Sequence, residues 1–526
     1  MNPFTSIMAK RPKKNKFDLS HERKFSCDHG QLVPIMCQEV LPGDSFRVQS
    51  EIMLRYSPLV APVMHRIDVY THYFFVPNRL VWNEWEDFIT GGEDGNASPT
   101  FPVLQITNAN KVNLNKGTLA DYFGIPVTGT PTVNTTYSIN ALPFKAYQLI
   151  YNEFYRDQNL TAKVDINIGS GGISGSDIIP YTTMRTRAWA KDYFTSALPW
   201  SQRGGEAVVP LGQIDDNSIT WKQPALAKRT ADGGNAVGSI QAKTGGDAGK
   251  LSTEGTDEIF IENIDRIDLA PTTINDLRKA ARLQEWLEKS ARGGARYIEQ
   301  ILSHFGVKSS DARLQRPQYL GGGRSPVVIS ETLSTAQTEQ AAQTLPEPAQ
   351  TASIPQGNMA GHGISVGSHN GFKRGFEEHG WIIGIMSVLP KAAYQQGLEK
   401  HWRKFDKFDY YWPSFAHLGE QEVNTSEIYF TWTETGQVTE TFGYQQRYAE
   451  YKYGRSIVAG DFRDDLDYWH MGRKFGEKPQ LNTKFVEYDD DKRIFAVREN
   501  VQSLYCQVYN RVSALRPIPY FSIPEL

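Results

Sequence analysis

Ser365 is the residue whose surroundings most resemble catalytic machinery. Residues 363–367 read Gly-Ile-Ser-Val-Gly, which satisfies the G-x-S-x-G pattern of hydrolase nucleophile elbows. That chemistry requires a strand, a sharp turn and a helix, so that the serine is exposed beside the amino terminus of the helix. The flanking sequences, NMAGHG before and SHNGFKRG after, predict no such elements. We therefore expect no catalytic residue, and a hydrolase that uses Ser365 is kept only as an alternative.

Potential metal ligands are scattered along the chain. Cys27, His29 and Cys37 have a spacing that fits no common zinc module, and a fourth ligand is not evident. The acidic runs at 464–467 and 489–491 offer the carboxylates that hard cations favour, but neither run has the EF-hand pattern. We predict no metal site and no cofactor, and whether divalent ions bind at subunit contacts is left open.

Aromatic and cationic side chains alternate in one segment between residues 400 and 412. Such a mixture is what stacking on single-stranded bases requires. It is also typical of subunit contacts, in which tryptophan, tyrosine and arginine concentrate. We favour a subunit contact or internal packing and leave base stacking as the alternative. The candidate residues are Trp402, Arg403, Phe405, Tyr410, Tyr411 and Trp412.

The amino-terminal residues 1–24 are strongly basic, with seven lysines and arginines against two acidic residues. Few apolar residues and two prolines predict an extended, mobile arm. Each lysine or arginine of such an arm would release a counterion on binding a phosphate, although a merely solvated tail fits the composition equally well. The candidates for such phosphate contact are Lys10, Arg11, Lys13, Lys14 and Lys16.

Two long strands organise the elements that position these residues. Residues 45–56 alternate between apolar and polar side chains, as in a strand with one buried and one exposed face. Residues 67–76 are apolar on both sides, which is typical of a strand covered on both faces. Further strands are expected at 326–330, 381–389, 493–497 and 501–511, with an edge-type segment at 30–43. The pattern predicts a large antiparallel β core.

Helices and loops fill the intervals between these strands. Apolar residues recur at helical spacing after Pro143 and again over 274–305, where a break is expected at Gly293 and Gly294. Gly321–Gly323 is interpreted as a turn before the strand at 326–330. Residues 221–256 hold hardly any large apolar side chains, so they must be exposed or disordered.

The composition bounds the class of protein. Forty percent apolar residues suffice for a sizeable core, and a net charge of −3 does not suggest a dedicated nucleic-acid binder. Three cysteines do not make a disulfide framework and suggest a reducing compartment. The longest apolar run, residues 381–390, is too short to cross a bilayer, and the amino terminus has no signal-peptide core. We therefore expect neither export by a signal peptide nor membrane insertion.

Five stretches resemble the major capsid protein of the Microviridae, small phages with single-stranded DNA, and most of all its gokushovirus-like branch. They read VPNRLVWNEWEDFITGG, ALPFKAYQLIYNEFYRDQNL, KDYFTSALPWSQRGG, TINDLRKAARLQEWLEKSARGGARYIEQILSHFGVKSSDARLQRPQYLGGGRSPVVIS and FGYQQRYAEYKYGRSIVAGDFR. Together they spread the resemblance over nearly the whole chain.

This resemblance implies a mainly β fold, an eight-stranded antiparallel viral jelly roll whose long loop insertions contain several α-helices. The basic arm (1–24), which is inferred from its composition and is longer and more basic than the usual start of this family, would precede a single jelly-roll domain (25–526), and the chain would end in an extended arm (512–526). The insertions are expected at about 92–205 (loop and helix), 206–262 (a variable surface projection), 272–306 (helices) and 331–370 (a low-complexity loop).

The resemblance also implies a structural, non-enzymatic function. Copies of the chain would self-assemble into a T=1 icosahedral shell around circular single-stranded DNA, in the virion and, during assembly, in the host cytoplasm. Implied partners are an internal scaffolding protein, a DNA-pilot protein, a small DNA-binding protein and a host cell-surface receptor. Candidates for the host-facing loop are Trp221, Lys222, Lys228, Arg229, Lys243 and Lys250. The alternative to a capsid protein is a jelly roll that binds sugar or nucleic acid.

Overall fold

The computed structural model describes most of the chain in separate ranges. These are 12–94, 96–127, 136–204, 227–229, 241–242, 251–252, 259–261, 274–293, 303, 315–333, 338–340, 352–354, 359–433, 436–497 and 501–521. The chain divides into two compact units, one of which comprises Gln202–Gly293 with Ser303–Phe305. The other unit holds the remainder of the chain.

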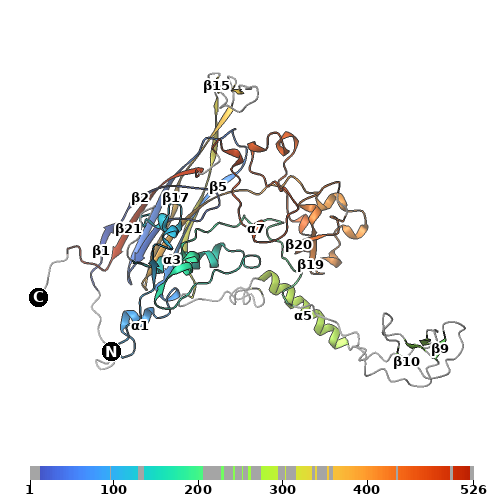
Figure 1. Ribbon diagram of the computed structural model, residues 1–526, viewed down its shortest axis with the longest axis horizontal. Coiled ribbons are helices and arrows are strands. Elements are labelled where there is room, and N and C mark those ends of the chain that lie inside the picture. Colours follow the sequence, from blue (N-terminus) through green and yellow to red (C-terminus); the bar gives the residue numbers. More distant parts are fainter. Residues whose placement is uncertain are drawn as a thin grey trace. The chain divides into compact units, whose positions relative to one another are not determined.

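The larger unit is built on two antiparallel sheets (Figure 1). In the first sheet, β1 (Asn15–Asp18) and β2 (His21–Cys27) both pair with β21 (Leu504–Arg516), followed in space by β4 (Ser45–Tyr56), β17 (Met359–Gly375) and β14 (Val328–Leu333). Along β4, every second side chain from Phe46 to Tyr56 is buried. The alternation predicted for residues 45–56 is therefore confirmed, because one face of this sheet meets the core and the other meets solvent.

The second sheet has the order β13 (Gln318–Pro326), β5 (Ile67–Pro77), β18 (Gly380–Pro390) and β3 (Val33–Val40). Strand β5 is buried on both faces, as its sequence predicts. Tyr73 and Phe75 contribute to the core between the sheets, whereas Phe74 and Val76 belong to a second core on the outer side.

The strand order identifies the fold as a jelly roll. Leaving aside β1 and β14, the strands are arranged as β2-β21-β4-β17 in one sheet and β3-β18-β5-β13 in the other. Strand β21 thus inserts between β2 and β4, and β18 inserts between β3 and β5, which gives two interlocked Greek keys. The eight-stranded antiparallel jelly roll with loop insertions is confirmed.

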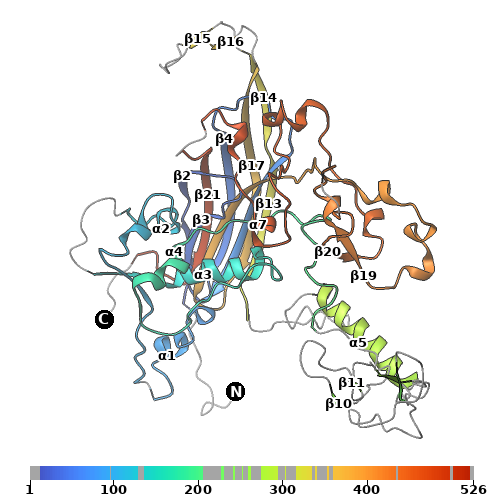
Figure 2. The same ribbon diagram turned by 45° about the vertical axis from the view of Figure 1, so that its right-hand side comes forward.

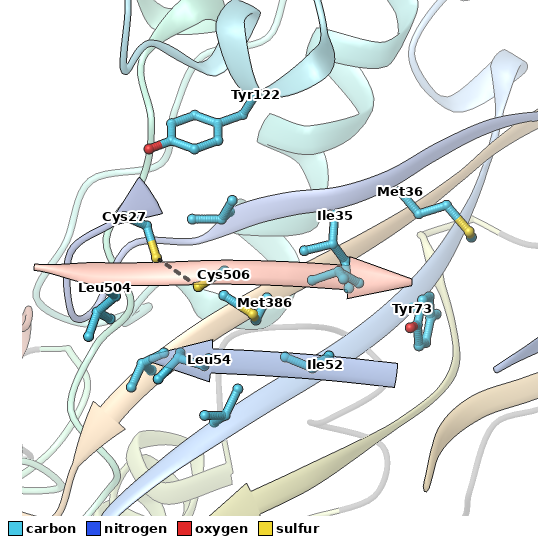
Figure 3. Packing of buried hydrophobic residues seen from close by; sticks show 14 of the residues in the cluster. Cys27, Ile35, Met36, Ile52, Leu54, Tyr73, Tyr122, Met386, Leu504 and Cys506 are labelled. Carbon is cyan, nitrogen blue, oxygen red and sulfur yellow. Dashed lines mark hydrogen bonds between the residues drawn. The ribbon is translucent and has the colours of Figure 1, made fainter. Parts of the chain in front are cut away.

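The core between the sheets joins residues from the two ends of the chain. Figure 3 shows Cys27 on β2 and Cys506 on β21 side by side, with Leu54 and Leu504 nearby. Leu54 and Leu504 are fully buried. Strands β2 and β21, from opposite ends of the chain, therefore share one apolar interior.

A layer of helices and short strands covers the outer face of the second sheet (Figure 2). Phe144, Tyr147 and Ile150 of α3 pack in the same cluster as Phe74 and Ile383 of the sheet. The helical face predicted after Pro143 is thereby confirmed. This layer contains α1 (Trp85–Thr90), α2 (Leu119–Phe123), α3 (Leu142–Ile150) and α4 (Ile179–Thr182), together with β6 (Val103–Ile106), β7 (Tyr137–Asn140) and β8 (Gly172–Ile173).

A third apolar cluster organises residues 391–490. Tyr394, Phe442 and Phe485 pack there with Tyr193 and Phe194, which come from much earlier in the sequence. The regular elements of this region are the antiparallel pair β19 (Glu420–Asn424) and β20 (Thr441–Gln446), and α7 (Thr483–Val486). The antiparallel pair of β15 (Thr338–Gln340) and β16 (Ala352–Ile354) also belongs to the larger unit.

The smaller unit contains the long helix α5 (Ile274–Gly293), which confirms the first of the two helices expected over 274–305. Two antiparallel strand pairs are described: β9 (Ala227–Arg229) with β12 (Ile259–Ile261), and β10 (Gln241–Ala242) with β11 (Leu251–Ser252). The second helix expected, beyond Gly294, lies outside the described residues apart from residue 303.

Several boundaries differ from the sequence predictions. Residues 15–24, expected in a mobile arm, belong largely to β1 and β2, because β21 offers them a pairing edge. Residues 359–370, expected in a low-complexity loop, form most of β17. Residues 512–516, assigned to the carboxyl-terminal arm, complete β21. The strand expected at 493–497 is wrong, because a 3-10 turn covers Lys492–Ile494.

Gly321–Gly323 is a further correction, because these glycines lie inside β13 and not in a turn. A Cβ atom on Gly323 would stand 1.8 Å from Asn370 Oδ1 of β17, and one on Gly322 would stand 2.1 Å from the carbonyl oxygen of Thr71. The glycines therefore allow neighbouring strands to approach closely, a use of glycine that a turn signal does not reveal.

Candidate interaction surfaces

The segment of residues 400–415 exposes a group of aromatic side chains, called here the aromatic surface. Its exposed members are Trp402, Phe405, Phe408, Tyr410, Tyr411 and Trp412. Phe405 is 89% exposed and Trp402 is 67% exposed. Apolar side chains gathered in this way on a surface are typical of a protein–protein contact. The structure thus places together all the aromatic candidates predicted from the sequence, and adds Phe408.

Local hydrogen bonds fix the backbone of the aromatic surface. The Asp409 carboxylate accepts hydrogen bonds of 2.9 Å from the backbone N–H groups of Phe405 and Asp406. These bonds hold the pKa of Asp409 below its ordinary value. The indole of Trp412 donates a hydrogen bond of 2.8 Å to the carbonyl oxygen of Lys407. The aromatic side chains are therefore presented on an ordered backbone.

The guanidinium of Arg403 forms its hydrogen bonds within the protein. It donates hydrogen bonds of 2.6 Å to Ser426 Oγ and 2.7 Å to the carbonyl oxygen of Val438. These contacts tie the segment to the chain around the β19–β20 pair. Burial lowers the pKa of Arg403, yet a guanidinium stays charged at physiological pH.

Lys404 is held in the same way beneath the aromatic surface. Its Nζ atom lies 3.2 Å from Glu450 Oε1 and 3.8 Å from the centroid of the Tyr451 ring. The side chains of Lys404 and Glu450 are only 5% and 12% exposed. Burial opposes the charge on Lys404, but hydrogen bonds with Tyr451 and Glu450 raise its pKa above the ordinary value. Because Arg403 and Lys404 are engaged inside the protein, the geometry favours a subunit contact over base stacking.

A small cavity of about 100 Å³ lies next to this ion pair. Its lining includes Glu427, whose Oε2 atom accepts a hydrogen bond of 2.9 Å from the Tyr193 hydroxyl and whose Oε1 atom accepts one of 3.0 Å from the backbone N–H of Asn424. Burial raises the pKa of Glu427. Glu450 on the same wall accepts a hydrogen bond of 2.6 Å from Gln421. Both carboxylates thus hold the framework that supports the aromatic surface.

The basic arm is only partly described. Lys10 and Arg11 lie outside the described residues, whereas Lys13, Lys14 and Lys16 are exposed. Lys14 donates a hydrogen bond from Nζ to the carbonyl oxygen of Gly43, and Lys16 lies on β1. The arm therefore enters the first sheet close to the beginning of β4.

Ser365 is buried in the middle of β17 and is 3% exposed. Its hydroxyl donates a hydrogen bond of 2.8 Å to the carbonyl oxygen of Pro326. Strand continues on both sides of it, so this serine does not occupy the strand–turn–helix elbow of a hydrolase. The sequence interpretation that rejected an elbow is confirmed, although the segment itself is a strand that the sequence did not predict.

Comparison with known proteins decides the class of this chain. A family model described as capsid protein (F protein) matches residues 5–526. The chain belongs to this capsid protein family. Capsid protein VP1 of Chlamydia phage 1 is 34% identical over 100% of this chain and 98% of the relative. The VP1 proteins of Bdellovibrio phage phiMH2K (34%; 99% and 97%) and Spiroplasma virus 4 (30%; 100% and 98%) are similarly related. The predicted Microviridae resemblance is confirmed, and the role of the chain is structural, in the virion.

The metal ligands considered for this capsid protein do not converge. All three cysteines are free thiols: Cys27 Sγ lies 3.9 Å from Cys506 Sγ, while Cys37 is on β3, where burial raises its pKa to about 12. Asp467 of the first acidic run pairs with Lys474. Within the described ranges, no three His, Cys, Asp or Glu side chains are grouped to hold a metal ion.

A buried polar network in the capsid protein escaped the sequence analysis. His29 Nε2 lies 2.8 Å from the Tyr56 hydroxyl, and His29 Nδ1 lies 3.5 Å from Asp490 Oδ1. Tyr193, Glu427 and Glu450 were missed as well. These partners come from distant parts of the sequence, so no local spacing could have signalled them.

Four of the six candidates for the host-facing loop lie outside the residues that the structure describes. Trp221, Lys222, Lys243 and Lys250 lie outside the described residues. Lys228 and Arg229 belong to β9, which pairs with β12. In the described part of the capsid protein, no helix combines the length and the apolar character that crossing a bilayer requires.

Proposed function

We propose that copies of this capsid protein close into a T=1 icosahedral shell around circular single-stranded DNA, and that the aromatic surface is covered by a neighbouring copy in that shell. The observation that carries the proposal is the aromatic surface itself, which is exposed, fixed by local hydrogen bonds and backed by inward-directed cations. Side chains of this kind, ordered before binding, lose little conformational entropy when an interface forms.

A closed shell requires head-to-tail contacts between different surfaces of identical copies, because such contacts generate rings about symmetry axes. The jelly roll supplies a rigid tile, and the insertions supply contact area without enlarging the core. The aromatic members of the contact would serve as its anchors, since tryptophan, tyrosine and arginine dominate interface energetics. No catalytic group takes part in this function.

The partners proposed are those of a phage capsid protein. Residues 206–262 would face the host and contribute to attachment to a surface receptor. An internal scaffolding protein, a DNA-pilot protein and a small DNA-binding protein would join the assembly in the host cytoplasm. The arm residues Lys10, Arg11, Lys13, Lys14 and Lys16 would contact the packaged DNA, in support of which stands the exposure of the last three.

The decisive experiment replaces Trp402 and Phe405 together by alanine. We expect the double variant to remain folded but to lose most particles in sedimentation and negative-stain micrographs, because two exposed anchors are removed. The variant Tyr137→Ala serves as the matched control, since Tyr137 is a 63% exposed aromatic residue elsewhere on the larger unit. Trp402→Phe with Phe405→Tyr should keep the particles. An alanine variant that yields particles of unchanged size and amount contradicts the proposed contact.

A further inference from the structure

Four cations lie together on the exposed face of the first sheet and are called here the sheet cations. They are Lys16 on β1, Arg47 on β4, Lys373 on β17 and Arg511 on β21. All four side chains are exposed. The residues next to them in the strands, such as Phe46, Phe372 and Val512, are buried in the core. Because successive side chains of a strand point to opposite faces, the sheet cations all face away from the core.

The register of the sheet places the sheet cations close to one another. Arg47 is paired directly with Lys373 on one side and with Ser513 on the other. Along β21, Arg511 lies two positions before Ser513 and Leu515 lies two positions after it. Lys16 of β1 is paired with Leu515. Neighbouring strands are about 4.8 Å apart, and the four backbone positions lie on the four neighbouring strands β1, β21, β4 and β17 at one end of the sheet.

The acidic side chains around the sheet cations do not neutralise their positive charge. Within the described part of the chain, none of the sheet cations forms an ion pair with an acidic side chain. Asp18 is the acid closest in register, opposite Ser513, and Lys16 and Arg511 help the Ser20 hydrogen bonds to lower its pKa. Glu22 and Glu51 both stand opposite Tyr509, two positions along β21 from Arg511, so they are diagonal neighbours of Arg511 but lie further from Arg47 and Lys373. Like charges directly opposite each other, as in the Arg47–Lys373 pair, destabilise a sheet unless an anion offsets them.

The basic arm leads to the same end of the sheet. Lys14 reaches the carbonyl oxygen of Gly43, which lies two residues before the first residue of β4, the strand that carries Arg47. Lys13 and Lys14 therefore extend the charged area beyond Lys16. An area that is several strands wide suits a chain of phosphates better than a single small anion. The exposed ring of Tyr505 lies further along the same face and offers a stacking surface for an unpaired base.

The two faces of the sandwich differ in a way that gives the protein an orientation. The outer face of the second sheet is covered by the layer that contains α3 (Figure 2). The outer face of the first sheet, by contrast, exposes Arg47, Glu51 and Arg55 of β4. We infer that the outer face of the first sheet is turned to the interior of the shell and that the sheet cations bind phosphates of the packaged single-stranded DNA. This inference rests on the proposed shell around DNA, and it adds the surface and the residues of contact.

Salt-dependent DNA binding tests the inference on the purified full-length protein. The quadruple variant Lys16→Gln, Arg47→Gln, Lys373→Gln and Arg511→Gln is compared with the unaltered protein for binding of a fluorescent oligothymidine at several salt concentrations. For single strands, each phosphate contact contributes about 0.7 to the magnitude of the slope of log K against log salt concentration. Loss of four contacts should therefore reduce the magnitude of this slope by roughly 3. Replacing Arg47 and Arg511 by lysine should preserve the slope, because the charge is kept.

A matched control removes four exposed lysines elsewhere on the larger unit by the substitutions Lys116→Gln, Lys163→Gln, Lys452→Gln and Lys484→Gln. It has the same net charge as the quadruple variant and should keep the slope of the unaltered protein. Equal slopes for the two variants overturn the inference. So does a quadruple variant that binds oligothymidine normally but loses an acidic partner protein. Particle formation is scored in parallel: if the unaltered protein forms no particles, the proposed function fails, whereas particles with unchanged DNA binding overturn only the sheet-cation contact.

Discussion

Replacing Lys404 by methionine tests whether the buried ion pair holds the aromatic surface in place. The substitution leaves the Glu450 carboxylate, which is 12% exposed, without the ammonium that stands 3.2 Å away. Removing one partner of a buried pair costs about 3–5 kcal/mol, because the remaining charge is desolvated and uncompensated. A solvent-exposed pair is worth at most about 1 kcal/mol. We therefore expect the Lys404 variant to lose about 3 kcal/mol or more of local stability.

Amide hydrogen exchange of the peptide 400–412 is the suitable assay, since local opening is reported by the residues that open. A loss of about 3 kcal/mol corresponds to exchange that is faster by roughly a hundredfold. The same variant should yield fewer particles, because the aromatic side chains are no longer fixed before they meet a neighbouring copy.

Lys478→Met is the matched control for this experiment. Lys478 and Glu440 form an ion pair of 2.8 Å whose side chains are 36% and 45% exposed. The control should change exchange in its own peptide by less than about fivefold. The double variant Lys404→Met, Glu450→Gln should recover part of the loss, since it leaves no buried unpaired charge. If the Lys404 variant behaves like the Lys478 variant, the ion pair does not support the aromatic surface.

Three further predictions concern pH and packing. Burial would raise the pKa of Glu450, but hydrogen bonds from Gln421 and Lys404 outweigh it and hold this pKa below its ordinary value of 4.5. The ionised carboxylate therefore stabilises the fold above pH 4.5, and this stabilisation is lost as the pH falls through the lowered pKa. Urea unfolding midpoints measured over this pH range should decline less in Glu450→Gln than in the unaltered protein. Gly322→Ala should cost about 3 kcal/mol or more, because the new Cβ atom would lie 2.1 Å from a backbone oxygen of Thr71, and soluble, normally stable protein would contradict this clash. Leu54→Ala should cost about 2–5 kcal/mol in urea unfolding, since Leu54 is 0% exposed, and a loss below 1 kcal/mol would show that the cavity collapses.

The elements that the sequence predicted correctly are those whose signal is local. The alternation of β4 and the two-sided apolar character of β5 follow from the strand period, and the apolar face of α3 follows from the helix period. The aromatic candidates could be found because their residue types are unusual at such density. Their partners could not be found, since Ser426, Val438 and Glu450 reach Arg403 and Lys404 only in the folded chain.

The errors have the same origin. The glycines at 321–323 were interpreted as a turn because local sequence does not record the close approach of β17 and β5. The carboxyl-terminal strand was ended too early, because β1 pairs with its last residues from the opposite end of the chain.

By itself, the sequence of this capsid protein determined the strands and helices whose signal is periodic, namely β4, β5 and the apolar face of α3, and the family to which the chain belongs. Only the tertiary structure decided which strands pair, which cations are directed inward, and which come together on an exposed sheet face. The reason is that periodicity acts over a few residues, whereas the pairing of β21 with both β2 and β4 joins the two ends of the chain.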